Sequence, residues 1–144
     1  MKAFRFRLQR VLEVKRLRVG REQEALADHL RTCQREDGEL KRLHQAYHTA
    51  REGSRRGRLG TVSPEEQSMW ISRLAWVDGQ LARQRESLER AQEALEEQRR
   101  ILAHAWRERE SLERLRKRRR AQHRIEEGRA EQKELDESRR HRPA

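Results

Sequence analysis

Two histidines and one cysteine are the residues of this chain best suited to metal or nucleophilic chemistry. His44 and His48 stand four residues apart, a spacing that places both side chains on one helical face and that zinc sites use. No cysteine or third histidine is close by, so we interpret them as a solvated pair. Cys33 falls in an apolar stripe and is expected to be a small buried hydrophobic residue.

Catalytic motifs are missing from the sequence. It contains no phosphate-binding loop, zinc-protease helix, nucleophile elbow or paired CxxC. Catalysis would also require a concave pocket, which a rod of two helices does not offer. We therefore predict that the chain is not an enzyme and uses no cofactor or metal.

Three tryptophans bear on binding. A two-helix coiled coil buries only part of an indole ring, so each tryptophan remains partly exposed. Trp70 lies in an apolar stripe and is expected to pack. Trp76 lies off the stripe and is expected to contact a partner, because exposed aromatic side chains often anchor interfaces. Trp106 stands beside a cluster of cations, where packing and contact are both open.

The composition favours an extended helical protein over a globular one. Charged residues make up 42% of the 144 residues, hydrophobic residues 33% and aromatic residues 4%, which is too little apolar material for an ordinary core. Disorder is the other interpretation of such a composition. However, only two prolines are present, and the helix formers Ala, Leu, Glu, Arg and Gln dominate. We therefore predict an all-α protein with a narrow core.

Two heptad stripes predict two helices. In the first stripe an apolar side chain recurs every seven residues, at Leu12, Val19, Leu26, Cys33, Leu40 and Tyr47. In the second stripe the recurring residue is leucine, at Leu74, Leu81, Leu88, Leu95 and Leu102. The second core position of the first helix is polar, with Lys15, Glu22, His29 and Glu36. A free-standing parallel dimer of the first helix would therefore be poor.

A glycine-rich segment separates the stripes. Gly53, Gly57 and Gly60 fall in a stretch without an apolar pattern, and glycines this dense are expected to break a helix. The capping box that follows has serine at the N-cap (Ser63), proline at the first helical position and glutamate three residues after the serine. The predicted elements are a first helix over about residues 4–52, a connector over about 53–63 and a second helix over about 64–138.

Two helices joined by a short connector are expected to fold back on each other. A turn near Gly60 pairs residues whose numbers sum to about 121, which places Leu40 by Leu81. The predicted fold is a single domain over residues 1–144. It is a long antiparallel two-helix coiled coil, or α-hairpin, whose C-terminal helix projects beyond the N-terminal one.

The net charge of +11 is concentrated towards both ends of the chain. Residues 1–21 hold eight cations against Glu13, and residues 107–124 hold nine cations against three glutamates. In an antiparallel hairpin these segments meet at the open end, and apolar side chains are interleaved with the cations: Phe4, Phe6, Leu8, Trp106 and Leu112. Such a basic end favours an acidic partner, which is a nucleic acid, an anionic membrane or an acidic protein surface, over the other interpretation, a charged face that is only solvated.

The protein is expected to be cytosolic. Residues 1–12 lack the apolar region and cleavage site of a signal peptide. No stretch approaches the roughly 18 apolar residues that span a bilayer. A single cysteine suits a reducing compartment. Membrane association would then be peripheral, and we expect a monomer when the protein is free.

Both ends of the chain resemble the FliJ proteins of bacterial flagellar export. The resemblance is carried by the run Phe4-Arg5-Phe6-Arg7-Leu8-Gln9-Arg10-Val11-Leu12, by Trp106-Arg107-Glu108 followed by Leu112, and by Arg129-Ala130-Glu131-Gln132-Lys133-Glu134-Leu135-Asp136-Glu137. The middle is similar in length, architecture and the Trp70-Ile71 step after the turn. The resemblance implies a coiled coil similar to the two-helix part of the ATP synthase gamma subunit. It also implies a non-enzymatic part of the flagellar type III export apparatus, and with it flagellum biogenesis, motility and chemotaxis.

The resemblance also implies three partners: a hexameric export ATPase, the cytoplasmic domain of the export gate, and export chaperones. The residues expected at the ATPase are Phe4, Arg5, Arg7, Leu8, Trp106, Arg116 and Arg118. The turn-proximal residues expected at the gate are Leu40, Leu43, Tyr47 and Trp76. These partners would hold the protein at the cytoplasmic face of the inner membrane, at the flagellar base.

Two other functions remain open. A basic coiled coil could bind nucleic acid through phosphate contacts, although the sequence has no base-reading motif and its middle is near neutral. The export function predicts no nucleic-acid partner. A structural homodimer built on the leucines of the second helix would show a doubled mass in light scattering.

Overall fold

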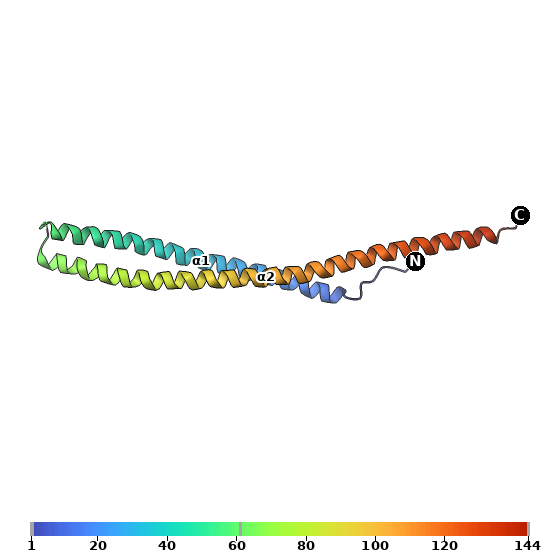
Figure 1. The fold of residues 1–144 in the computed structure, drawn as a ribbon, viewed down its shortest axis with the longest axis horizontal. Helices are drawn as coiled ribbons and strands as arrows, with labels where there is room; N and C mark the ends of the chain where they lie inside the picture. Colours follow the sequence, from blue (N-terminus) through green and yellow to red (C-terminus); the bar gives the residue numbers. More distant parts are fainter. Residues whose placement is uncertain (1, 61, 144) are drawn as a thin grey trace. The chain divides into compact units, whose positions relative to one another are not determined.

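Two long helices form most of the protein. The computed structural model describes residues 2–60 and 62–143, and within them α1 spans Gln9–Arg58, α2 spans Pro64–Arg140, and there is no strand (Figure 1). Contacts divide the chain into two units. The terminal unit comprises the described residues of Met1–Gln23 and Ile101–Ala144, and the hairpin unit comprises those of Glu24–Arg100. The expectation of a single domain stays a prediction.

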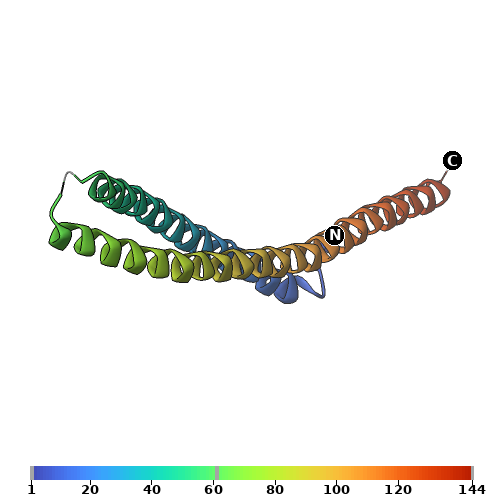
Figure 2. The ribbon, with the colours of Figure 1, turned by 60° about the vertical axis from the view of Figure 1, so that its left-hand side comes forward.

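The hairpin unit is an antiparallel pair of helices. Residues 24–58 of α1 lie beside residues 64–100 of α2, as Figures 1 and 2 both show. Its core is formed by Leu43, Val77 and Leu81, with Leu40 and Tyr47 among the half-buried residues packed against it. Leu40 and Leu81, which the predicted register pairs, thus belong to one cluster. The predicted all-α coiled-coil hairpin is confirmed.

The start of α2 agrees with the capping box. The Glu66 backbone N–H donates to Ser63 Oγ at 3.3 Å, and the Gln67 N–H donates to the Ser63 carbonyl at 3.0 Å, so serine is the N-cap and Pro64 begins the helix. On the other side of the turn, the Gly60 N–H donates to the Gly57 carbonyl. Gly60 has φ +78°, the left-handed conformation that glycine adopts after a helix.

The connector is shorter than predicted, because α1 continues through Gly53 and Gly57 to Arg58. Both glycines are buried, and both face α2 closely. A Cβ on Gly53 would overlap the indole of Trp70, and one on Gly57 would stand 3.0 Å from Cγ of Gln67. These glycines therefore permit close helix packing instead of breaking the helix, and the prediction that the connector begins at residue 53 was wrong.

In the terminal unit α1 and α2 are also packed against each other. Leu12, Val19 and Ala105 are buried in its seam. Arg116 Nε donates to Gln9 Oε1 at 3.1 Å, so the beginning of α1 lies beside a late segment of α2. Residues 128–140 are exposed at every position, which agrees with the predicted projection of α2 past the N-terminal segment.

The first residues of the chain are not helical, contrary to the prediction of a helix from about residue 4. α1 begins at Gln9, whose N–H donates to the Phe6 carbonyl at 3.1 Å. Before it, burial alternates: Phe4, Phe6 and Leu8 are half-buried, whereas Arg5 and Arg7 are exposed. A period of two residues is typical of extended backbone, which lets every second side chain face α2.

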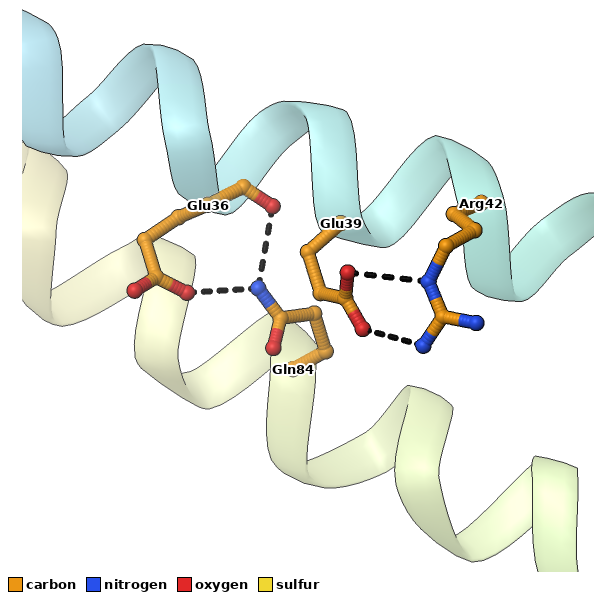
Figure 3. A network of polar contacts seen from close by, with 4 residues as sticks. All are labelled: Glu36, Glu39, Arg42 and Gln84. Atoms are coloured by element: carbon orange, nitrogen blue, oxygen red, sulfur yellow. Dashed lines mark hydrogen bonds and ion pairs between the residues drawn. The ribbon is translucent and has the colours of Figure 1, made fainter.

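Polar residues interrupt the seam of the hairpin unit. Gln84 Nε2 donates to the Glu36 carbonyl at 2.9 Å and to Glu36 Oε2 at 2.5 Å, across the two helices (Figure 3). Beside this contact Arg42 donates to both carboxylate oxygens of Glu39 within α1. Glu36 stands at the polar second core position of the first helix, and a glutamine from the opposite helix donates a hydrogen bond to it.

Candidate partner-binding site

The charge divides sharply between the two units. Met1–Gln23 and Ile101–Ala144 contain 22 cations and 11 anions, whereas Glu24–Arg100 contains 14 of each. The net charge of +11 therefore belongs entirely to the terminal unit. A surface with this excess attracts acidic partners and steers them at long range, and the effect weakens with salt.

An open groove runs between the extended N-terminal segment and α2 in the terminal unit. Its volume is about 960 Å³. Four of the residues expected to bind the ATPase line the groove, namely Phe4, Arg5, Arg7 and Leu8. Leu115 and Arg119 of α2 line it as well. The groove thus combines apolar side chains with guanidinium groups, a pairing suited to an amphipathic acidic segment.

His123 holds the extended segment against α2. Its Nε2 lies 3.1 Å from the Lys2 carbonyl and 3.1 Å from Glu127 Oε1, and its ring lies 5.6 Å from the ring of Phe4, centroid to centroid. Both oxygens are acceptors, so Nε2 must carry the hydrogen and donate to them. Sequence reasoning missed His123, because nothing near it in the sequence indicates that residues 2–4 lie beside it.

Ion pairs cross from α1 to α2 in the same unit. Lys15 Nζ lies 2.7 Å from Glu108 Oε2, and Arg16 Nε lies 2.7 Å from Glu113 Oε1. The hydrogen bond from Lys15 lowers the pKa of Glu108 below its ordinary value. The hydrogen bond from Arg16 does the same to the pKa of Glu113. Lys15 and Arg16 are therefore engaged inside the terminal unit.

The other three residues expected at the ATPase lie outside the groove lining. Trp106 is 46% exposed, with the Arg109 guanidinium 5.7 Å from its ring centroid, a cation–π contact. Arg116 is half-buried and donates to Gln9. Arg118 is exposed and lines a separate shallow hollow with Arg114 and Lys117, among others. The expected residues thus share a unit without forming one continuous patch.

The residues expected at the gate differ in their exposure. Trp76 is 62% exposed, as its position off the stripe suggested. Leu40 and Tyr47 are half-buried against the core cluster. Leu43 is only 4% exposed and belongs to that cluster, so its side chain is part of the fold and not of the surface. Trp70 is half-buried against Gly53, as a packing residue should be.

The residues considered for metal or thiol chemistry occupy ordinary places. His44 is half-buried and His48 is exposed, and within residues 2–60 and 62–143 no three His, Cys, Asp or Glu side chains form a group that could hold a metal ion. Cys33 is half-buried and not in a disulfide. Neither feature points to a reaction.

Comparison with known proteins identifies the family. The family described as Flagellar FliJ protein matches residues 4–143, which is nearly the whole chain. The chain belongs to the FliJ family. No curated protein and no solved structure matches it. Membership of the FliJ family makes the chain a component of flagellar protein export. In the described parts of this FliJ-family chain, no helix is long and apolar enough to cross a membrane.

Proposed function

We propose that the chain is a non-enzymatic stalk of the flagellar type III export apparatus. In this proposal the terminal unit binds the hexameric export ATPase. The hairpin unit meets the cytoplasmic domain of the export gate, and the stalk helps to handle export chaperones. The protein would work in the cytoplasm, at the inner face of the membrane.

The distribution of charge carries this proposal. All of the net charge lies on the unit that also holds the FliJ-like runs at both ends of the sequence. A ring of subunits that presents acidic side chains around its opening would attract this unit and leave the neutral hairpin unit outside. The groove lined by Phe4, Arg5, Arg7 and Leu8 adds apolar contacts to that attraction.

The proposed gate contact is centred on Trp76. Trp76 exposes 62% of its surface, and exposed tryptophan side chains are often the anchors of protein interfaces. Leu40 and Tyr47 are half-buried and offer only their outer edges, and the buried Leu43 supports them from beneath.

Binding of nucleic acid is less well supported. The hairpin unit has no net charge, so only the terminal unit would attract phosphates. The exposed surface of the terminal unit mixes cations with valine, leucine and tryptophan side chains. Phosphate contacts alone do not explain those apolar groups.

Co-elution with the purified export ATPase tests the proposal. The full chain should form a complex that survives size-exclusion chromatography at moderate salt and should raise the rate of ATP hydrolysis. A chain that elutes alone at every salt concentration, and leaves hydrolysis unchanged, would contradict the stalk function. A parallel titration with duplex DNA at two salt concentrations measures non-specific phosphate binding.

A further inference from the structure

On the outward side of the first turns of α1, two exposed aliphatic residues stand between two arginines, and the coiled-coil seam uses none of the four. Val14 and Leu17 are 61% and 63% exposed. Arg10 and Arg21 complete the spacing i, i+4, i+7 and i+11, which places all four side chains on one helical face. We call these four residues the outward stripe.

The outward stripe is not needed to hold the terminal unit together. The seam on the other side of the same helix already contains Leu12 and Val19, which are 0% and 2% exposed. The cross-helix ion pairs are made by Lys15, Arg16 and Arg18. Arg10 and Arg21 are exposed, and neither takes part in the ion pairs found among residues 2–60 and 62–143. The stripe is therefore free to bind something outside the chain.

We propose that the outward stripe lies on the headgroup region of an anionic lipid bilayer. A helix with aliphatic side chains on one face and flanking arginines binds a membrane surface by burying those side chains and by attraction to anionic lipid. Guanidinium groups suit lipid phosphates because they donate two parallel hydrogen bonds. This contact goes beyond the proposed ATPase and gate contacts, and neither of them is required for it.

Other occupants fit the stripe less well. A second copy of the chain would bring together two units that each carry all of the +11 charge. A nucleic acid would use the arginines but not Val14 and Leu17. A folded protein partner buries about 800 Å² on each side and usually relies on aromatic anchors, whereas the stripe is narrow and its apolar side chains are aliphatic. A bilayer requires only a few apolar side chains together with charge.

Co-sedimentation of the full chain with lipid vesicles tests the proposal. The chain should bind vesicles of phosphatidylglycerol with phosphatidylcholine, should not bind vesicles of phosphatidylcholine alone, and should be released by high salt. The double variant Val14→Ser, Leu17→Ser should bind the anionic vesicles about tenfold more weakly, since each buried aliphatic group adds to membrane affinity. Its matched control is Met69→Ser, Ile71→Ser, which removes side chains that are 50% and 52% exposed in the neutral unit and should change nothing.

A second readout places the stripe at the bilayer. In a Cys33→Ser background, a polarity-sensitive dye on Leu17→Cys should shift to shorter wavelength with anionic vesicles, and the same dye on Gln45→Cys should not. Equal binding of the wild type and the stripe variant to anionic vesicles would overturn the proposal, as would a wild-type chain that does not bind anionic vesicles. If the stripe variant instead loses only the ATPase or only duplex DNA, the stripe belongs to that partner. ATPase co-elution is measured without lipid. A chain that fails to bind the ATPase can therefore be distinguished from a chain that fails to bind vesicles.

Discussion

Gly53 on α1 faces the indole ring of Trp70 on α2, so closely that a Cβ on the glycine would stand 2.5 Å from Cε2 and 2.6 Å from Cε3 of the ring. Carbon atoms that are not bonded do not approach so near. The tryptophan therefore occupies the space that any other residue at position 53 would fill. This pair explains why a glycine stands inside a helix. It also explains how a protein of two helices makes room for an indole ring, since the glycine has no side chain.

Replacing a glycine inside a helix with alanine usually stabilises the protein, but the same replacement at Gly53 should destabilise it. Gly53→Ala should lower the free energy of unfolding by about 1–3 kcal/mol, because overpacking outweighs the gain in helix propensity. Gly38→Ala is the control, since nothing lies within 4 Å of a Cβ at that position. It should raise the free energy of unfolding by up to about 1 kcal/mol. Urea unfolding followed by circular dichroism measures both, and equal shifts in the same direction would contradict the packing.

The two tryptophans of the hairpin unit should separate stability from binding. Trp70→Ala should lower the free energy of unfolding by about 2 kcal/mol or more, because the ring packs against Gly53. Trp76→Ala should change stability by less than about 0.5 kcal/mol, since the ring is 62% exposed. We expect Trp76→Ala to weaken binding to the gate domain at least about tenfold in calorimetry. Unchanged affinity would remove Trp76 from the gate contact.

Much of the fold followed from the sequence because a coiled coil is encoded locally. Heptad leucines such as Leu81 and Leu95 lie in the seam, and Ser63 caps α2 at the predicted residue. The connector was misplaced because glycine has two uses, as a helix breaker and as a point of close approach. Only the position of Trp70 across the turn decides between them.

The candidate site was harder to predict than the fold. The alternation of Phe4, Arg5, Phe6 and Arg7 has a period of two and could have indicated an extended segment. The contact of His123 with Lys2 depends on tertiary structure, and no local pattern reveals it. Leu43 was expected at the surface that meets the gate, but its side chain is buried in the core. Its burial depends on which side of α1 faces α2, and the sequence of α1 alone does not give that.

The polar contact between Glu36 and Gln84 should lower the stability of the hairpin but favour the correct pairing of its two helices. Replacing both residues with leucine should raise the melting temperature, because an apolar pair packs in the seam without the cost of burying polar groups. The same change should weaken the discrimination against other pairings, and a fraction of the double variant should appear as a dimer in light scattering. A lower melting temperature with an unchanged mass would show that the contact itself stabilises the hairpin.

The cross-helix carboxylates should make the terminal unit sensitive to acid. The pKa values of Glu108 and Glu113 are lowered in the folded protein, so the unfolded chain binds more protons as the pH falls below the ordinary value of about 4.5. Their contribution is complete above that pH and is lost as the pH falls through the folded pKa values. Glu108→Gln should therefore flatten the loss of melting temperature between neutral and acidic pH. Glu93→Gln, at an exposed position in the hairpin unit, should leave the profile unchanged.

Binding of charge-reversed variants to the purified export ATPase tests the stalk function most directly. Arg5→Glu, Arg7→Glu, Arg116→Glu and Arg118→Glu together change the charge of the terminal unit by eight. The matched control makes the same change on exposed arginines of the hairpin unit, at Arg51, Arg73, Arg83 and Arg85. We predict that the first variant loses ATPase binding and stimulation while the control retains both, with equal helicity in circular dichroism. Unchanged binding by the first variant, or equal loss by both, would contradict a function located in the terminal unit.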